Sequence, residues 1–387
     1  MQGIFLLQKN VSVLANYVQT VLCYSNIIKG NVIPKTNNET EDFTMKRKMV
    51  SALLCATMVA GMVVVPAATA QAADKKLIGV TMPTKDLQRW NQDGDNMKKE
   101  LEAAGYEVDL QYASNDVSTQ VSQLENQVAN GCDLLVVASI DGSSLGEPLK
   151  QAKEKGIPVI SYDRMVNNAN TDLYISFDNR KVGEIMAQAL VNALPQGGDV
   201  FMIQGSSSDN NVQMVKQGFD DMLADTDLHV VYEANCDGWT AELAAGYVEE
   251  ALEKYPHVKG IMCGNDDIAS QVVQVLAENQ LAGNVVVVGQ DGDLAACQRI
   301  VEGTQYMTAF KPIEDLARKA AKYAVEMGSG KGVAELEDVT ETVNDGTYEI
   351  PSCILEPTAV TKENIDKVII EGGFHRRDEV YLNADYS

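Results

Sequence analysis

Arg89 and Trp90 stand side by side in the stretch KDLQRWNQD, residues 85–93, shortly after a segment with strand character. Arginine carries a rigid fork of hydrogen-bond donors, and tryptophan offers a large, flat, apolar face. A ligand that is polar at its edge and apolar on its face would satisfy both side chains, and a pyranose sugar has that shape. The pair therefore predicts a carbohydrate site, if other suitable residues reach the same place.

Polar groups also follow most of the other apolar segments. VISY is followed by Asp163 and Arg164, and VVVVGQ is followed by Asp291. Because ligands of open α/β sheets bind beyond the carboxyl ends of the strands, we expect these groups to meet in one cleft. The strand-end groups are Arg89-Trp90, Asp163-Arg164, 209–211, 237–239, 265–267, Asp291 and Lys311.

Each of these groups also has an ordinary structural explanation. An Asp after a strand often caps the next helix, which would account for Asp209, Asp266 and Asp291. Arg164 would pair with a surface acid, Lys311 would be solvated, and the two tryptophans would be core residues. Seven groups at the same strand end are a pattern that these separate explanations do not account for, and the pattern favours a cleft.

The elements that must position these groups alternate regularly along the chain. Several apolar segments are continuous runs, which is typical of strands covered on both faces. The expected strands are 76–82, 107–113, 132–139, 158–163, 173–178, 199–205, 229–234, 258–266, 285–291 and 306–311. The expected helices are 88–104, 119–130, 144–155, 179–193, 210–224, 240–254, 267–280 and 314–328. This alternation predicts an α/β fold with parallel sheets, and ten strands suggest two sheets that divide near residues 178–183.

Residues 45–72 have the pattern of a secretory signal peptide. The basic start at residues 45–48 leads into an apolar run from Met49 to Ala68 and then into the small-residue exit AATAQAA, which places cleavage near Ala72. A membrane anchor is the alternative, because the apolar run approaches spanning length. We therefore expect export to the periplasm or the outer cell surface.

An upstream extension and a cysteine accompany this signal. Residues 1–44 form an upstream extension that is translated only if Met45 is not the true start. Cys55 lies in the apolar run, but it comes early and follows the large Leu54, which argues against a lipoprotein site.

Composition and charge exclude several classes of protein. The chain of 387 residues has a net charge of −24. Residues 1–72 contain six Lys or Arg and three Asp or Glu, which leaves 25 basic and 52 acidic side chains in the remainder. Such a chain repels nucleic acid and anionic lipid, so a neutral ligand is favoured.

Known catalytic and metal-binding patterns are absent from the sequence. IQGSSSDNN lacks the Gly-Lys-Ser/Thr of a phosphate-binding loop, and there is no G-x-S-x-G motif. Three scattered histidines, and five cysteines after residue 72 without C-x-x-C spacing, indicate no metal site. Asp163 and Asp291 could serve a glycosidase, but Arg164 and Lys311 would keep them ionised, whereas a glycosidase acid needs a raised pKa.

From about Lys75 to His375 the chain resembles the periplasmic D-xylose-binding proteins of bacterial sugar importers, within the type I sugar-binding-protein superfamily. Related aldose-binding proteins that bind several sugars share much of the pattern, so the family is better defined than the sugar. The motifs that carry the resemblance are QRW, ISYDRMVNNANTDLYISFDNRKVGE, DNN, DGW, NDDIAS, VVGQDGDLAACQRIVEGTQYMTAFKPI and IIEGGFH.

The resemblance implies two doubly wound parallel-sheet lobes, joined by a three-segment hinge, with one sugar buried between them. The N-terminal lobe would comprise residues 74–181 and 312–354, and the C-terminal lobe residues 182–311 and 355–387. The sugar contacts carried over from the family are Arg89, Trp90, Asp163, Arg164, Asp209, Asn211, Trp239, Asn265, Asp291 and Lys311.

The resemblance also implies a function. The protein would be a monomeric extracytoplasmic binding protein, not an enzyme, without cofactor or metal, that delivers a monosaccharide to an ABC permease. D-xylose is the expected sugar, and a broader aldose-binding protein that also feeds a chemoreceptor is the alternative. The chain departs from the family at Gln88, where an acid is common, and in the serine-rich QGSSSDNN loop.

Two other classes compete with this interpretation. A sugar-acting enzyme on the same fold would need an acid and a nucleophile on either side of the anomeric carbon. A transcription regulator with this effector fold would need a basic DNA-binding segment and no export signal, and the sequence here has the opposite pattern.

Overall fold

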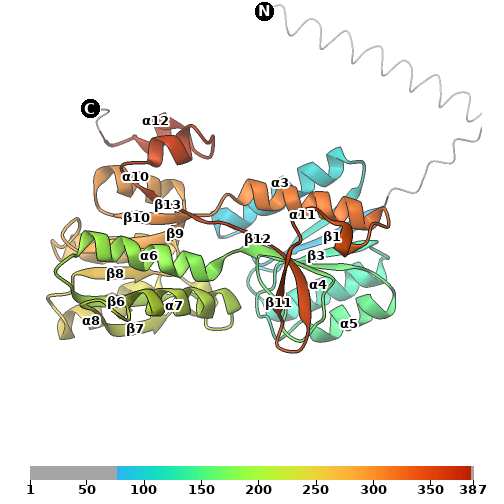
Figure 1. The fold of residues 1–387 in the computed structure, drawn as a ribbon, viewed down its shortest axis with the longest axis horizontal. Helices are drawn as coiled ribbons and strands as arrows, with labels where there is room; N and C mark the ends of the chain where they lie inside the picture. The colour runs from blue at the N-terminus through green and yellow to red at the C-terminus, as the bar shows by residue number, and fades with distance from the viewer. Residues whose placement is uncertain (1–75, 385–387) are drawn as a thin grey trace, which may run out of the picture. The chain divides into compact units, whose positions relative to one another are not determined.

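The computed structural model describes residues 76–384, which belong to one compact unit of the chain, residues 72–387. The predicted signal peptide and the upstream extension lie outside the described residues. All ten predicted strands are present, in two separate sheets with helices on their faces (Figure 1). The structure confirms the α/β class and the two-lobed, mainly parallel architecture.

The first lobe is built on a seven-stranded sheet with the order β11-β12-β5-β4-β3-β1-β2. Its strands are β1 (Leu77–Met82), β2 (Glu107–Tyr112), β3 (Leu134–Val137), β4 (Val159–Tyr162), β5 (Leu173–Phe177), β11 (Glu341–Asn344) and β12 (Glu349–Leu355). Every residue of β3, β4 and β5 is buried, as a strand covered on both faces requires.

Helices cover both faces of this sheet. Helices α3 (Gln88–Ala103) and α11 (Ile313–Gly328) share a core with Ile78, Val80 and Val136 on one face. Helices α4 (Val117–Ala129) and α5 (Gly146–Glu154) pack against Leu135 and Val137 on the other face. The alternation of neighbouring strand residues between two cores is the pleat of a doubly covered sheet.

The second lobe is built on a six-stranded sheet with the order β13-β10-β9-β8-β6-β7. Its strands are β6 (Gly198–Gln204), β7 (Leu228–Asn235), β8 (Gly260–Cys263), β9 (Val286–Asp291), β10 (Met307–Phe310) and β13 (Thr358–Thr361). The helices of this lobe are α6 (Asn179–Ala193), α7 (Asn210–Leu223), α8 (Leu243–Lys254), α9 (Asp266–Glu278), α10 (Leu294–Glu302) and α12 (Arg377–Val380).

Helices α6 and α7 cover one face of the second sheet and α8 and α9 the other. Two glycines allow α6 and α7 to approach closely. A Cβ on Gly183 would lie 1.9 Å from the Val215 carbonyl oxygen, and a Cβ on Gly218 would lie 2.0 Å from that of Arg180. This contact at the middle of α7 holds the helix, whose first turn carries Asn211, against α6.

The chain passes between the two sheets at three points. It crosses at Asp178 between β5 and α6, at Lys311-Pro312 between β10 and α11, and at residues 356–357 between β12 and β13 (Figure 1). Asp178 also caps α6 by accepting a hydrogen bond from the Lys181 amide. Each crossing is short, so the carboxyl ends of both sets of parallel strands are held near one another.

Several elements near the end of the chain were not predicted from the sequence. Strand β12 runs parallel to β5, but β11 and β13 are antiparallel edge strands that the alternating pattern did not predict. Helix α10 and a single π-helical turn, labelled η3 (Asp366–Ile370), were also missed. All five cysteines after the signal, at positions 132, 236, 263, 297 and 353, are buried free thiols.

We find no helix between residues 76 and 384 that combines the length and apolarity needed to cross a bilayer.

Candidate functional site

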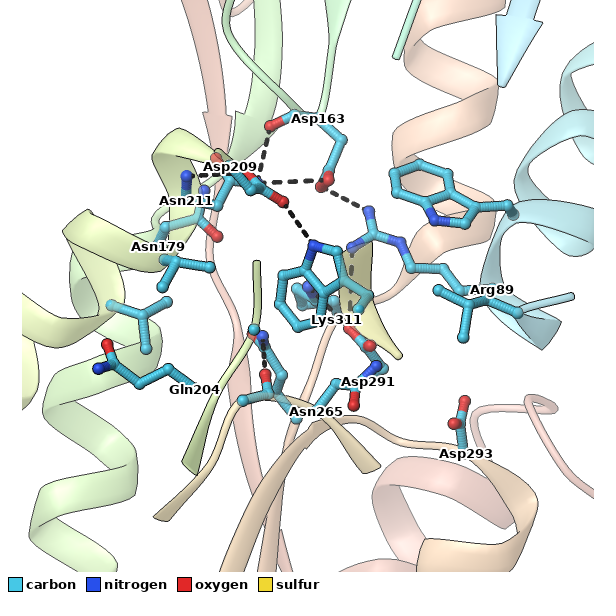
Figure 2. Close-up of a pocket in the computed structure, with 18 of the residues that line it drawn as sticks. Arg89, Asp163, Asn179, Gln204, Asp209, Asn211, Asn265, Asp291, Asp293 and Lys311 are labelled. Carbon is cyan, nitrogen blue, oxygen red and sulfur yellow. Dashed lines mark hydrogen bonds and ion pairs between the residues drawn. The ribbon is translucent and has the colours of Figure 1, made fainter. Parts of the chain in front are cut away.

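A cavity lies where the strand ends of the two lobes face each other (Figure 2). Nine of the ten predicted contacts line it, and Arg164 does not. The nine residues are Arg89, Trp90, Asp163, Asp209, Asn211, Trp239, Asn265, Asp291 and Lys311. Residues separated by more than 200 positions in the sequence therefore meet in one place.

Arg89 is the centre of the charged network on the first lobe. It projects from the first turn of α3, and its side chain is 9% exposed. Its guanidinium lies 2.5 Å from Asp163 Oδ1 and 3.2 Å from Asp93 Oδ2. It also reaches across to the second lobe, where Nη1 lies 3.7 Å from Asp291 Oδ1. Burial alone would lower the pKa of Arg89, but these carboxylates raise it above its ordinary value, so the side chain stays charged.

Asp163 is held as a carboxylate by its neighbours. Burial acts to raise the pKa of Asp163, but Arg89 and Lys311 outweigh burial and hold the pKa below its ordinary value. Its backbone carbonyl accepts hydrogen bonds from Tyr174 Oη at 3.1 Å and Ser176 Oγ at 2.7 Å. The side chain is therefore fixed as an acceptor, and it lacks the raised pKa that a glycosidase acid needs.

Three cavity residues adopt left-handed backbone conformations. The φ angles are 62° at Asp163, 59° at Trp239 and 102° at Asp291. Such angles cost free energy for residues other than glycine, on the order of 1–3 kcal/mol each, and they concentrate at functional sites. Their occurrence at three strand-end positions supports a binding role over simple capping.

Arg164 links the two lobes from behind the cavity wall. Its Nε lies 2.7 Å from Asp209 Oδ2 in the second lobe, and its Nη1 donates to the Ser139 carbonyl at 3.1 Å. Its guanidinium carbon lies 4.9 Å from the ring centre of Trp90 and 5.7 Å from that of Trp239. Arg164 therefore positions one carboxylate and both indoles, and it does not line the cavity itself.

The two tryptophans differ in their surroundings. Trp90 is 2% exposed and belongs to the hydrophobic core of the first lobe. Trp239 is half-buried on a 3-10 turn, labelled η1 (Asp237–Trp239), and its Nε1 donates to Asp209 Oδ2 at 3.2 Å. Gly205 makes room for it, because a Cβ there would lie 2.2 Å from the indole. The core explanation thus holds in part for both, because Trp239 packs against the edge of the second-lobe core, but Trp239 is also held by a polar contact of the site.

Capping and site roles coexist at two other positions. Asp209 caps α7 through the Asn211 amide at 3.0 Å, and Asn265 caps α9 through the Ile268 amide at 2.9 Å. Both residues also line the cavity. Asp266 has another role: it lies beneath the turn that carries Asp291, and its carboxylate accepts from the Gly292 amide at 2.9 Å.

Three buried oxygens lining the cavity have no hydrogen-bond partner within the described part of the chain. They are Asn211 Oδ1, Gln290 Oε1 and Asp291 Oδ1. Asp291 Oδ1 lies 2.7 Å from Lys311 Nζ, but as an ion pair without hydrogen-bond geometry. An unpaired buried acceptor costs about 1–3 kcal/mol. The cavity therefore presents acceptors that ligand donors would satisfy.

Sequence reasoning missed several cavity residues. Gln290 and Gln204 occupy the last or next-to-last position of β9 and β6, where strand-end reasoning could have found them. Asn179 and Asp293 also line the cavity, and Figure 2 shows both at its edge. Gln88, noted as a departure from the family pattern, is a lining residue as well.

The site has more carboxyl groups than cations, because Asp293 also lines the cavity. The three cations Arg89, Arg164 and Lys311 pair with Asp163, Asp209 and Asp291. No cation is left without a carboxylate for an anionic ligand, and the open groups are oxygens that accept hydrogen bonds. Within residues 76–384 no group of His, Cys, Asp or Glu is arranged to hold a metal ion. The site therefore suits a neutral molecule with several hydroxyl groups and apolar C–H surfaces.

Comparison with known proteins agrees with this geometry. Residues 78–332 match the family described as "periplasmic binding protein domain". The chain is similar to the D-xylose-binding periplasmic protein of Haemophilus influenzae, with 38% identity across 86% of this chain and 99% of that protein. It is also similar to the D-xylose-binding periplasmic protein of Escherichia coli, with 40% identity across 78% and 92%.

A solved structure shows similarity of the same degree. It is an ABC transporter solute-binding protein from Clostridium phytofermentans with bound β-D-glucose, with 38% identity and a TM-score of 0.72. The alignment covers 79% of this chain and all of that structure. From the family match and the two relatives we conclude that the chain belongs to the periplasmic binding protein family.

Proposed function

We propose that this protein is an exported solute-binding protein that captures one monosaccharide between its lobes and delivers it to the permease of an ABC importer. The observation that carries the proposal is the cavity lined by two indoles and by three buried acceptor oxygens that lack a hydrogen bond, of which Asp291 Oδ1 is held in an ion pair with Lys311. Sugar hydroxyls would donate to the oxygens, and the C–H faces of the ring would lie against tryptophan. The family consists of binding proteins and not enzymes.

The proposal assigns the ten predicted residues to sugar binding. Arg89 and Lys311 would donate to ring hydroxyls, and Asp163, Asp209 and Asp291 would accept from them, because hydrogen bonds to charged groups are stronger than neutral ones. Asn211 and Asn265 would add amide contacts. Trp90 and Trp239 would cover the sugar faces, with Arg164 acting through Asp209 and the indoles.

Binding would proceed by closure of the lobes around the sugar. The proposed lobes are residues 74–181 with 312–354, and residues 182–311 with 355–387. Contacts across the cleft, such as the hydrogen bond of 3.2 Å from Asn115 Nδ2 to the Gly238 carbonyl, would hold the closed form. The closed form selected by the ligand is the shape that a permease would recognise. We further propose that the protein acts as a monomer.

D-xylose is the first choice of sugar, because the two relatives described above are D-xylose-binding proteins. The alternative is a binding protein of broader specificity, and it is favoured by the β-D-glucose bound in a structure that is equally similar in sequence. A chemoreceptor as a second partner is part of this alternative. The decisive difference is whether the cavity accepts the additional hydroxymethyl group of glucose.

Isothermal titration calorimetry with xylose, glucose, galactose, arabinose and ribose tests the proposal. We expect saturable one-to-one binding, with xylose tightest and glucose weaker or comparable. Ribose or galactose binding tenfold more tightly than xylose would contradict the assignment. An absence of heat with all five sugars, or hydrolysis of aryl glycosides by the protein, would contradict the proposed function itself.

A further inference from the structure

The motif IIEGGFH, residues 369–375, carries part of the family resemblance but contributes no residue to the cavity. Its last residue nevertheless reaches the turn that carries Asp291. His375 is 9% exposed, and its Nε2 lies 2.8 Å from the Gly292 carbonyl oxygen. A carbonyl only accepts hydrogen bonds, so Nε2 must carry the proton and donate.

The Gly292 peptide is held from its other side by Asp266. The Gly292 amide donates to Asp266 Oδ2 at 2.9 Å, and the Asp293 amide donates to the same oxygen at 3.1 Å. Asp266 is fixed in turn by Thr308 Oγ1 and Gln305 Nε2, both at 2.8 Å. One buried carboxylate therefore satisfies two consecutive amides of the turn.

The turn needs such support because its backbone is strained. The φ angles are 102° at Asp291 and 80° at Gly292. Gly292 has no room for a side chain, since a Cβ would lie 2.7 Å from the Phe310 ring. A non-glycine residue in the left-handed region persists only where its surroundings hold it. The two residues on either side of Gly292, Asp291 and Asp293, both line the cavity.

Packing and backbone hydrogen bonds within the motif fix the position of His375. The Phe374 ring lies edge-on to Phe310 with 4.8 Å between ring centres, and it lies 4.4 Å from the His375 ring. Gly373 turns the chain at a φ of 81°, and the Phe374 amide bonds to the Ile369 carbonyl at 2.9 Å. Ile369 is buried with Val380 in a cluster that includes Phe310.

We propose that His375 is a positioning residue of the binding site: with Asp266 it clamps the Gly292 peptide and thereby fixes the turn that presents Asp291 and Asp293 to the ligand. The inference rests on the proposed sugar-binding function for its effect on affinity. The clamp itself consists of contacts between protein atoms of the second lobe. The C-terminal segment is thus part of the site, although none of its residues touches the cavity.

The test compares His375→Ala with His375→Gln in the full chain. Glutamine places an amide nitrogen near the position of Nε2 and keeps the donor. We expect D-xylose affinity to fall about tenfold in the alanine variant, as follows if the turn without its clamp is in the binding-competent form about one tenth of the time, and to be largely restored in the glutamine variant. Val380→Ala is the matched control, because it loosens the same cluster without removing the donor, and we expect it to lower thermal stability but leave affinity unchanged.

Amide hydrogen exchange of the ligand-free protein separates this inference from the proposed function. Exchange at residues 291–293 should become at least tenfold faster in His375→Ala but not in Val380→Ala. Unchanged exchange in the alanine variant, or equal effects of the two alanine variants on exchange or on affinity, would overturn the clamp. If the wild-type protein bound none of the sugars, but exchange were still faster in His375→Ala than in Val380→Ala, the clamp would stand and the proposed function would be contradicted.

Discussion

The two lobes contribute differently to the cavity. The first lobe supplies Arg89, Asp163 and Trp90, which are buried and bonded to other residues of the protein. The second lobe supplies Asn211, Gln290 and Asp291, each with a buried oxygen that lacks a hydrogen bond. No first-lobe residue lining the cavity has such an atom within the described chain.

This difference suggests a division of roles between the lobes. The first-lobe half is complete without a ligand, so its side chains also stabilise the fold. In the second-lobe half, Asp209 and Asp291 are held in ion pairs, but the three oxygens without a hydrogen bond would receive one only from donors outside the protein. Substitutions in the first lobe should therefore reduce both stability and affinity, whereas substitutions of the open acceptors in the second lobe should reduce affinity with little loss of stability.

The largest effect is expected for Arg89→Ala. This change leaves Asp93, Asp163 and Asp291 without their shared partner, and an uncompensated buried charge costs about 3–5 kcal/mol. We expect the free energy of unfolding in urea to fall by about that amount and sugar binding to be lost. Arg89→Lys is the control. It keeps the positive charge but not the several hydrogen-bond donors of the guanidinium, and it should lose less stability. If Arg89→Ala kept wild-type stability, the first-lobe residues of the cavity would not stabilise the fold, and the proposed difference between the lobes would be wrong.

The two tryptophans should respond unequally. Trp90→Ala removes a core side chain and should cost about 3–5 kcal/mol of stability as well as affinity. Trp239→Ala should weaken binding with a smaller loss of stability, because Trp239 is only half-buried.

Fluorescence sharpens this comparison. Trp90 is already shielded from water, so Trp239 should provide most of the change in emission when the sugar binds. The signal should largely persist in Trp90→Phe and largely disappear in Trp239→Phe. Equal contributions from the two indoles would contradict the difference between the lobes, and two silent indoles would contradict the stacking of the sugar.

Asn211→Ala tests the open acceptors of the second lobe. It removes one acceptor oxygen and should weaken sugar binding by about 1–3 kcal/mol, roughly fivefold to a hundredfold. Stability should fall by only about 1 kcal/mol, for the bond of 3.1 Å from Asn211 Nδ2 to the Asp163 carbonyl. Asn210→Ala is the matched control, since Asn210 bonds to Asn167 across the cleft but does not line the cavity. A weaker effect at Asn211 than at Asn210 would count against this assignment.

The smallest effect is a pH dependence of stability that arises in the first lobe. Burial raises the pKa of Asp93 from 3.8 to about 6, although Arg89 acts against it. Because the folded pKa exceeds the unfolded one, the stabilisation from Asp93 is fully present below pH 3.8 and is lost as the pH rises through about 6. Asp163, whose pKa is lowered, contributes the opposite way: its stabilisation is lost only as the pH falls through its folded pKa.

Between pH 7 and pH 5 the wild-type protein should therefore gain stability from Asp93, on the order of 1 kcal/mol. Urea unfolding of wild type and Asp93→Asn at both pH values isolates this share from other titrating groups such as Asp266. The gain on acidification should be smaller in the variant. Equal gains in the two proteins would show that Asp93 does not titrate in this range.

Much of the fold could be predicted because strand and helix periods alternate clearly through β10. The strands after β10 have sequence patterns that are less typical of strands. Strand β12 contains Pro351, which argues against an interior strand, and β11 is a short polar edge strand. Edge pairing depends on which sheet the chain rejoins after α11, and no local pattern in the sequence contains that information.

Most of the predicted residues line the cavity, but the direction of their side chains could not be predicted from the sequence. Strand-end position brought Asp291 and Lys311 into one cavity as expected. The direction of a side chain depends on its packed neighbours, so Arg164 could not be placed behind the indoles from sequence alone. Asp293 lies two positions beyond the strand end, and its place in the cavity depends on the strained turn at Gly292.

A crystal structure of the protein with D-xylose would test the central claim most directly. The account predicts a single sugar between the lobes, with hydroxyl oxygens within about 2.5–3.2 Å of Asn211 Oδ1, Gln290 Oε1 and a carboxylate oxygen of Asp291. It also predicts an indole face of Trp239 against the ring. A sugar bound elsewhere, or in this cavity with those second-lobe oxygens still unpartnered, would contradict the account.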